Sequence, residues 1–122
     1  MERDTFLATL RELNDNFRRT FTGGTIVVSP RFDELHAELK SDILWRIRNF
    51  DAFEPNEEWD PENEHAYLAL NYRGCNIVAL IDYWSLDEPG AYSDDATNPA
   101  VTKRVLTVRF ADERGDFSLP SE

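Results

Sequence analysis

The chain has 122 residues, a formal net charge of −11 at pH 7 and an isoelectric point near 4.5. This acidic excess repels phosphate, which argues against direct binding to DNA, RNA or anionic membranes and favours a basic protein surface or a divalent metal ion as partner. No apolar run approaches the roughly 18 residues that a membrane-spanning helix needs. The single cysteine, Cys75, allows neither an internal disulfide nor a Cys-based metal site.

These properties, with a start that lacks the pattern of a secretory signal, predict a cytoplasmic protein that folds as one domain over residues 1–122. The polar end, residues 112–122, is expected to form a mobile tail. We expect a monomer or a homodimer that needs no cofactor.

The negative charge is concentrated in the middle of the chain. Residues 49–102 contain twelve acidic residues and one basic residue, whereas the segments on either side carry equal numbers of each sign. All twelve of these acids fall in two runs, residues 51–64 and 82–95. Solubility alone does not require segregated charge. The clustering therefore indicates a recognition surface, and a merely solvated acidic face is the alternative.

Two stretches with helical periodicity precede the acidic runs. The first predicts a helix from Asp4 to Phe17, with Asp4 as its N-cap. A short β-branched strand, residues 25–28, separates it from the second. The second helix begins after the cap Ser29 and runs for about five turns to residue 50, with a break at Ser41-Asp42 as an alternative.

After the first acidic run the hydrophobic period changes to two, which is typical of strands. We predict strands over residues 66–72, 76–84 and 102–111, the last of them half-buried, with a tight hairpin at Arg73-Gly74 and a long loop over residues 85–99. The expected fold is α+β. It has an antiparallel sheet of about four strands with two or three helices on one face, in the order α-β-α-β-β-β.

Five segments, in order along the chain, point to a known family. They are LNDNFRRTFTGG (13–24), FDAF (50–53), DPENEH (60–65), IDYW (81–84) and ATNPAVTKRVLTV (96–108). Together they resemble the motifs of a family of small uncharacterised bacterial proteins, domain-of-unknown-function family 3768. The similarity extends from about Leu13 to Glu113. It is specific for the family, and the family has no established activity.

The chain departs from the family pattern at several positions. Ala66 stands where the pattern has Asp after its His, Ala79-Leu80 replaces Trp-Lys, and Ser85 replaces an acid. If members shared a catalytic Asp-His-Lys set, this chain would keep only His65 and Asp82. The resemblance therefore favours recognition over catalysis.

The first acidic run has a regular spacing. Glu58, Asp60, Glu62 and Glu64 occupy every second position. In an extended segment they would lie on one side, roughly 6.5–7 Å apart. This spacing is similar to that of neighbouring phosphates in a nucleic-acid strand. The row could therefore occupy a basic groove in place of a nucleic acid. Alternatively, Asp60-Pro61 opens a helical turn with Asp60 as N-cap, and the acids face water.

We predict that both acidic runs contribute to one partner-binding surface. Aromatic residues are the usual anchors of protein interfaces, and Trp59 has that role here. The predicted contact residues are Glu54, Glu57, Glu58, Trp59, Asp60, Glu62, Glu64, Asp87, Glu88, Asp94 and Asp95.

Two chemical alternatives use the same region. Asp60, Glu62 and Glu64 could bind Ca²⁺ or Mg²⁺, whereas two histidines and one cysteine make zinc improbable. A metal-dependent enzyme would use His65 with Asp60, Glu64 and Asp82, so His65 and Asp82 are the candidate catalytic residues. A structural or homo-oligomeric domain without catalysis is a third interpretation.

Asp82 lies among apolar residues near the end of a predicted strand. An isolated buried carboxylate is unfavourable, so we expect Asp82 to pair with Arg104, Arg109 or backbone amides of the following loop rather than to act as a catalytic acid. The preferred interpretation is a non-enzymatic acidic protein that mimics nucleic acid and inhibits a basic nucleic-acid-binding protein. Small acidic bacterial proteins that inhibit restriction or CRISPR machinery act in this way.

Overall fold

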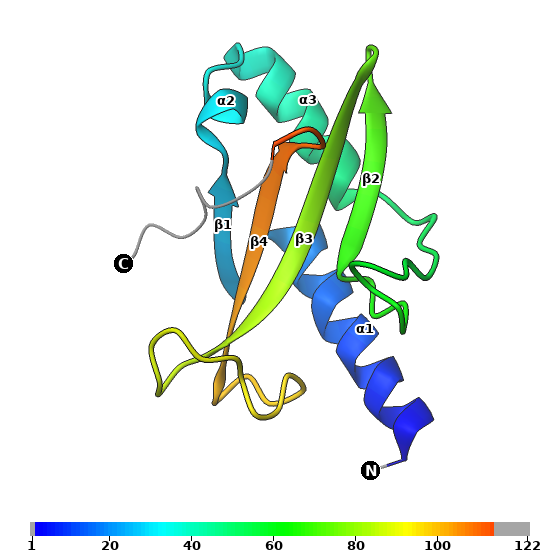
Figure 1. The fold of residues 1–122 in the computed structure, drawn as a ribbon, viewed down its shortest axis with the longest axis vertical. Helices are drawn as coiled ribbons and strands as arrows, with labels where there is room; N and C mark the ends of the chain where they lie inside the picture. Colours follow the sequence, from blue (N-terminus) through cyan, green and yellow to red (C-terminus); the bar gives the residue numbers. More distant parts are fainter. Residues whose placement is uncertain (1, 114–122) are drawn as a thin grey trace.

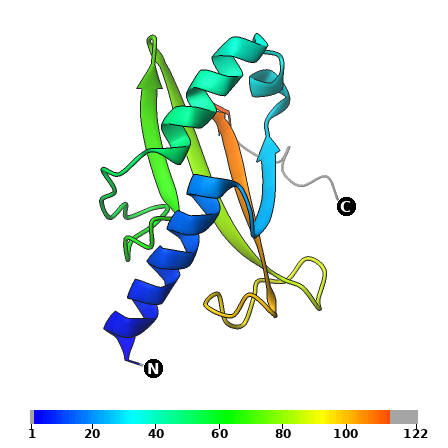
Figure 2. The ribbon, with the colours of Figure 1, turned by 180° about the vertical axis from the view of Figure 1, so that it is seen from behind.

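The computed structural model describes residues 2–113 and shows an α+β fold in which helices cover one face of a four-stranded sheet (Figures 1 and 2). The strand order is β1-β4-β3-β2. In chain order the elements are α1 (Arg3–Thr20), β1 (Gly24–Val28), α2 (Pro30–Asp33), α3 (Ala37–Arg48), β2 (Tyr67–Tyr72), β3 (Cys75–Ser85) and β4 (Thr102–Phe110).

The sheet is mixed, so the expectation of a purely antiparallel sheet is wrong for one strand. β2, β3 and β4 are antiparallel neighbours, whereas β1 pairs in parallel with β4. The helices between β1 and β2 return the chain to the end of the sheet where β1 began, so β1 and β2 run in the same direction. Two reversals later β4 has that direction too, and it fills the position next to β1.

The helix boundaries differ from the prediction in two places. Asp4 lies within the first turn of α1, and Glu2 holds the N-cap position without a side-chain cap. The second helix is broken before Ala37 rather than at Ser41-Asp42. His36 has a ψ of 144°, which is not helical and starts α3 afresh. Ser29 caps α2 as predicted, because its side chain accepts a hydrogen bond from the Phe32 amide.

The core lies between the helices and one face of the sheet. Alternate residues of the two central strands point into it: Ile77, Ala79 and Ile81 from β3, and Leu106, Val108 and Phe110 from β4. From the helices Phe17, Phe32, Ile43 and Ile47 complete the cluster. This arrangement follows from the period of two in the strands and the apolar stripes of the helices.

β4 is buried on both faces, not half-buried as the alternation predicted. Val105 is 1 % exposed and Arg109 is 9 % exposed on the face away from the helices. The reason is position, since β4 lies between β1 and β3, and the Trp59 ring lies 5.8 Å from the Arg109 guanidinium carbon.

The hairpin at Arg73-Gly74 is confirmed, with positive φ angles of 53° and 89° at its two turn residues. Within residues 2–113 no helix is long and apolar enough to cross a membrane. Residues 114–122 of the expected tail lie outside the part of the chain that the structure describes.

Candidate binding surface at the acidic end of the sheet

Both acidic loops lie at one end of the sheet. Residues 49–66 lead from α3 into β2, and residues 86–101 connect β3 to β4. β2 starts opposite Leu80 and β4 starts opposite Ser85, so both loops lie towards the end of the sheet where β3 finishes, with α1 between them (Figure 2). The chain order of the elements therefore brings the two acidic runs towards the same end of the sheet, on either side of α1.

The first acidic loop is a series of turns, so the predicted extended row of carboxylates does not form. Asp60 is only 3 % exposed. Its two carboxylate oxygens accept hydrogen bonds from the Glu64 and Ala66 amides, at 2.8 and 3.0 Å. The alternative prediction, a turn opened by Asp60, agrees better with the structure, since the Asn63 amide donates a hydrogen bond to the Asp60 carbonyl. Asp60 nevertheless faces the protein, not water.

Glu64 is also part of the folded structure. Its carboxylate accepts a 2.8 Å hydrogen bond from the Tyr83 hydroxyl. Burial, with the nearby Asp60 and Glu62 charges, raises the pKa of Glu64 above its ordinary value despite that hydrogen bond. Burial first, and the Glu64 charge second, also raise the pKa of Tyr83, which keeps the phenol protonated as a donor.

Asn14 of α1 connects both acidic loops to the sheet. Its side-chain amide donates to the Glu64 carbonyl (3.0 Å) and the Tyr83 hydroxyl (2.8 Å). Its oxygen accepts from Arg104 (2.9 Å), and Arg104 also donates to the Ala96 carbonyl of the second loop. Sequence reasoning missed Asn14. A signal was present, because Asn14 lies four residues after Leu10 and three before Phe17, inside the apolar stripe of α1.

His65 pairs with Asp15, a residue that the sequence analysis did not single out. The His65 Nδ1 lies 3.0 Å from the Asp15 carboxylate, which also accepts from the buried Arg18 at 2.8 Å. Burial opposes ionisation of Asp15, but the bonds from Arg18 and His65 prevail and lower its pKa. The imidazole stacks on the Phe53 ring, with centroids 4.4 Å apart. The pair fixes the loop against α1.

Asp82 does not join this group, and the expectation that it is paired is wrong. Ile81 and Tyr83 face the helices, so Asp82 between them lies on the opposite face of the sheet. Within residues 2–113 its carboxylate forms no hydrogen bond or ion pair, and burial raises its pKa. Arg104 donates to Asn14 and to the Ala96 carbonyl, and Arg109 donates to backbone carbonyls such as that of Glu113.

The metal-dependent alternative has no supporting geometry in the described part of the chain. No three His, Cys, Asp or Glu side chains there lie close enough to hold a metal ion. Asp60 uses its oxygens on backbone amides, and Asp82 lies on the face of the sheet away from Glu64. The proposed catalytic set of His65, Asp60, Glu64 and Asp82 is therefore not assembled.

The remaining predicted contact residues lie at the surface. Trp59 is 39 % exposed and stacks on Tyr67, so it packs partly on its own sheet. Glu62 pairs with Arg3 of α1 at 2.6 Å. The other carboxylates are exposed: Glu54, Glu57, Glu58, Asp87, Glu88, Asp94 and Asp95. All seven are exposed, although one oxygen of Asp95 accepts hydrogen bonds from the Thr97 amide and hydroxyl.

Comparison with known protein families assigns the chain to one of them. Residues 28–113 match the family described as "Protein of unknown function (DUF3768)". Since the match covers more than half of the sequence, the chain belongs to this family, as the motif resemblance indicated. Neither the curated proteins nor the solved structures contain a significant match.

Proposed function

We propose that this protein is a non-enzymatic binding protein whose acidic end docks on a basic surface of another protein. The observation that carries the proposal is that seven of the predicted contact carboxylates in the two loops are exposed and form no ion pair with another residue of the range 2–113. Clustered, unpaired charge destabilises a compact fold by self-repulsion. A cationic partner would relieve that repulsion.

The kind of partner follows from the charge. The nucleic-acid groove of a defence or regulatory protein is a strongly basic surface, and occupying it would inhibit that protein. The support is the clustering of charge at one end, not a phosphate-like spacing, because residues 56–63 form turns. Association would be fast and would slow as salt rises. The proposal places the protein in the cytoplasm, where the exposed thiol of Cys75 would stay reduced.

The test is a charge-reversal comparison. The tagged protein is used to isolate partners from its native host, and each purified partner is titrated with wild type, with Glu57→Lys/Glu58→Lys and with a control, Glu34→Lys/Glu38→Lys. All four residues are exposed, and both variants change the net charge equally. We expect the loop variant to bind at least about tenfold more weakly and the control to bind almost as wild type. Equal affinities, or affinity that does not change with salt, would contradict the proposal.

A further inference from the structure

β2 forms an edge of the sheet with free backbone groups. Its strand neighbour is β3, and no second strand pairs with it among the described residues. The Ile81 amide donates to the Ala66 carbonyl, and such pairs alternate along an antiparallel ladder, so the even-numbered residues of β2 bond to β3. The amides and carbonyls of Tyr67, Ala69 and Asn71 therefore point away from the sheet.

This edge lacks the features that usually prevent strand pairing. Natural edge strands are blunted by charged residues, by proline or by bulges. The β2 sequence YLALNY contains neither a charged residue nor proline. Its register with β3 is continuous from Tyr67 to Tyr72, without a bulge. The sequence of β2 therefore lacks these particular barriers to pairing.

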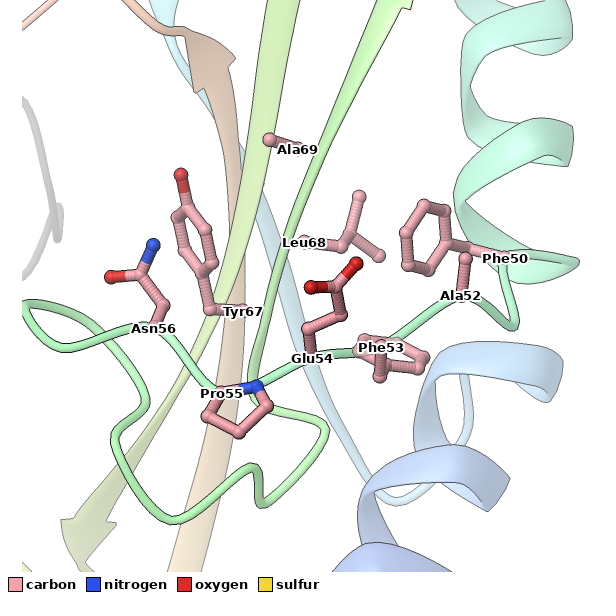
Figure 3. A pocket seen from close by; sticks show the side chains of 9 residues that line it. All are labelled: Phe50, Ala52, Phe53, Glu54, Pro55, Asn56, Tyr67, Leu68 and Ala69. Carbon is pink, nitrogen blue, oxygen red and sulfur yellow. The ribbon is translucent and has the colours of Figure 1, made fainter.

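A groove beside the edge adds an acidic contact. It lies between residues 50–56 and the start of β2, with a volume of about 240 Å³. Phe50 and Leu68, the latter from β2 itself, form its apolar side, and the Glu54 carboxylate lies next to Leu68 (Figure 3). The volume is below the roughly 300–1,000 Å³ of small-molecule sites. It suits one or two side chains of a bound peptide.

We propose that β2 binds an extended basic segment of a partner by strand addition, with a Lys or Arg side chain of that segment beside Glu54. Backbone hydrogen bonds would supply affinity, and the groove would select side chains at alternate positions. This inference rests on the proposed function and specifies how the basic partner is held.

Charge decides between this occupant and a second copy of the chain. Two copies paired through β2 would bring together two molecules that each carry −11, including two Glu54 side chains. Like charges opposed across strands are destabilising. A basic segment instead places its cations beside the Glu54 carboxylate.

The first experiment tests the backbone bonds with peptides. An alternating Val-Lys octapeptide with blocked ends is titrated against the wild-type protein by calorimetry, beside a twin with N-methylated backbone amides and a Val-Glu octapeptide. We expect the methylated twin to bind at least about tenfold more weakly, because it cannot donate to the edge, and the acidic peptide not to bind. Amide NMR signals of Tyr67, Ala69 and Asn71 should shift on binding.

Variants test the same contacts from the protein side. Ala69→Pro removes an outward amide while leaving the β2–β3 bonds, so it should weaken binding about tenfold. Glu54→Gln should weaken binding and reduce its dependence on salt. Its matched control, Glu38→Gln, makes the same change at an exposed position on α3 and should leave the affinity unchanged.

Three results would overturn strand addition. One is equal binding of the plain and the N-methylated Val-Lys peptides to the wild-type protein. This comparison tests strand addition even if Ala69→Pro does not fold. Another is wild-type dimerisation that Ala69→Pro abolishes, because the edge would then be occupied by a second copy. The third is a partner isolated by the acidic loops that binds Ala69→Pro and wild type equally. In that case the proposed acidic binding function stands and only the strand addition fails.

Discussion

Carboxylate side chains have different roles in this protein, and the position of each in the fold decides its role. Asp60 has its oxygens on two backbone amides, Glu64 accepts from a tyrosine, and Asp15 accepts from an arginine and a histidine. Glu57 is exposed to water. A buried carboxylate with both oxygens bonded, such as that of Asp60, has none to offer a partner. The candidate surface is therefore smaller than the acidic composition implies.

Asp82 gives a prediction with a defined pH dependence. Its pKa is raised by burial, so the folded protein disfavours the ionised form. The resulting destabilisation is absent below the unfolded pKa of about 3.9 and grows as pH rises through the folded pKa. Asp82→Asn should therefore raise the midpoint of thermal unfolding at pH 7 and leave it almost unchanged at pH 3. A lower midpoint at pH 7 would indicate that the carboxylate has a stabilising partner.

At the level of elements, Asn14 joins α1 to β3, to β4 and to the first acidic loop, and it holds Arg104, which binds the second loop. It is fully buried, and its removal leaves the Tyr83 hydroxyl and the Arg104 guanidinium each short of one hydrogen-bond partner. Asn14→Ala should lower the free energy of unfolding by about 2–4 kcal/mol, measured by urea denaturation. Amide hydrogen exchange should increase most in the first loop, which loses its bond to Asn14, and less in the second, whose bond partner Arg104 loses the Asn14 oxygen.

Asn16 on the same helix provides the control. Its side chain is exposed, so Asn16→Ala should change stability by less than about 0.5 kcal/mol. If the two substitutions had similar effects, the Asn14 contacts would contribute little to the attachment of the loops.

The elements themselves were predictable because their signals are local. The period of two located three strands, the Arg73-Gly74 pair located the hairpin, and Ser29 before proline located a helix start. The parallel pairing of β1 was not predictable in the same way. It depends on where the crossover returns the chain, which is set by packing between segments some 80 residues apart.

The candidate site was partly predictable for the same reason. Counting charges along the sequence located both acidic loops. For an exposed carboxylate such as Glu57, that count was enough to predict a place on the surface. The turn around Asp60 was not distinguished from an extended row, because either conformation fits that spacing. Asn14 contacts Arg104, which lies 90 residues further along the chain, and no local sequence pattern indicates such a contact.

At the scale of the whole molecule, the segregated charge should make stability depend on salt. At pH 7 the chain carries −11, and its isoelectric point is near 4.5. Raising salt from about 0.01 to 0.15 M shortens the screening length from about 30 to about 8 Å, which reduces repulsion between the acidic loops. We expect the thermal midpoint to rise by about 2 °C at pH 7, equivalent to roughly 0.5 kcal/mol, and hardly at all at pH 4.5.

The two charge-reversal variants separate clustering from net charge. Glu57→Lys/Glu58→Lys and Glu34→Lys/Glu38→Lys carry the same total charge, but the first dilutes the acidic end and the second leaves it intact. If clustered repulsion causes the salt effect, the first variant should show a clearly smaller rise in midpoint than the second. Equal rises would assign the effect to net charge alone. A partner bound at the acidic end would then relieve no local repulsion, because that end would hold none beyond that of the molecule as a whole.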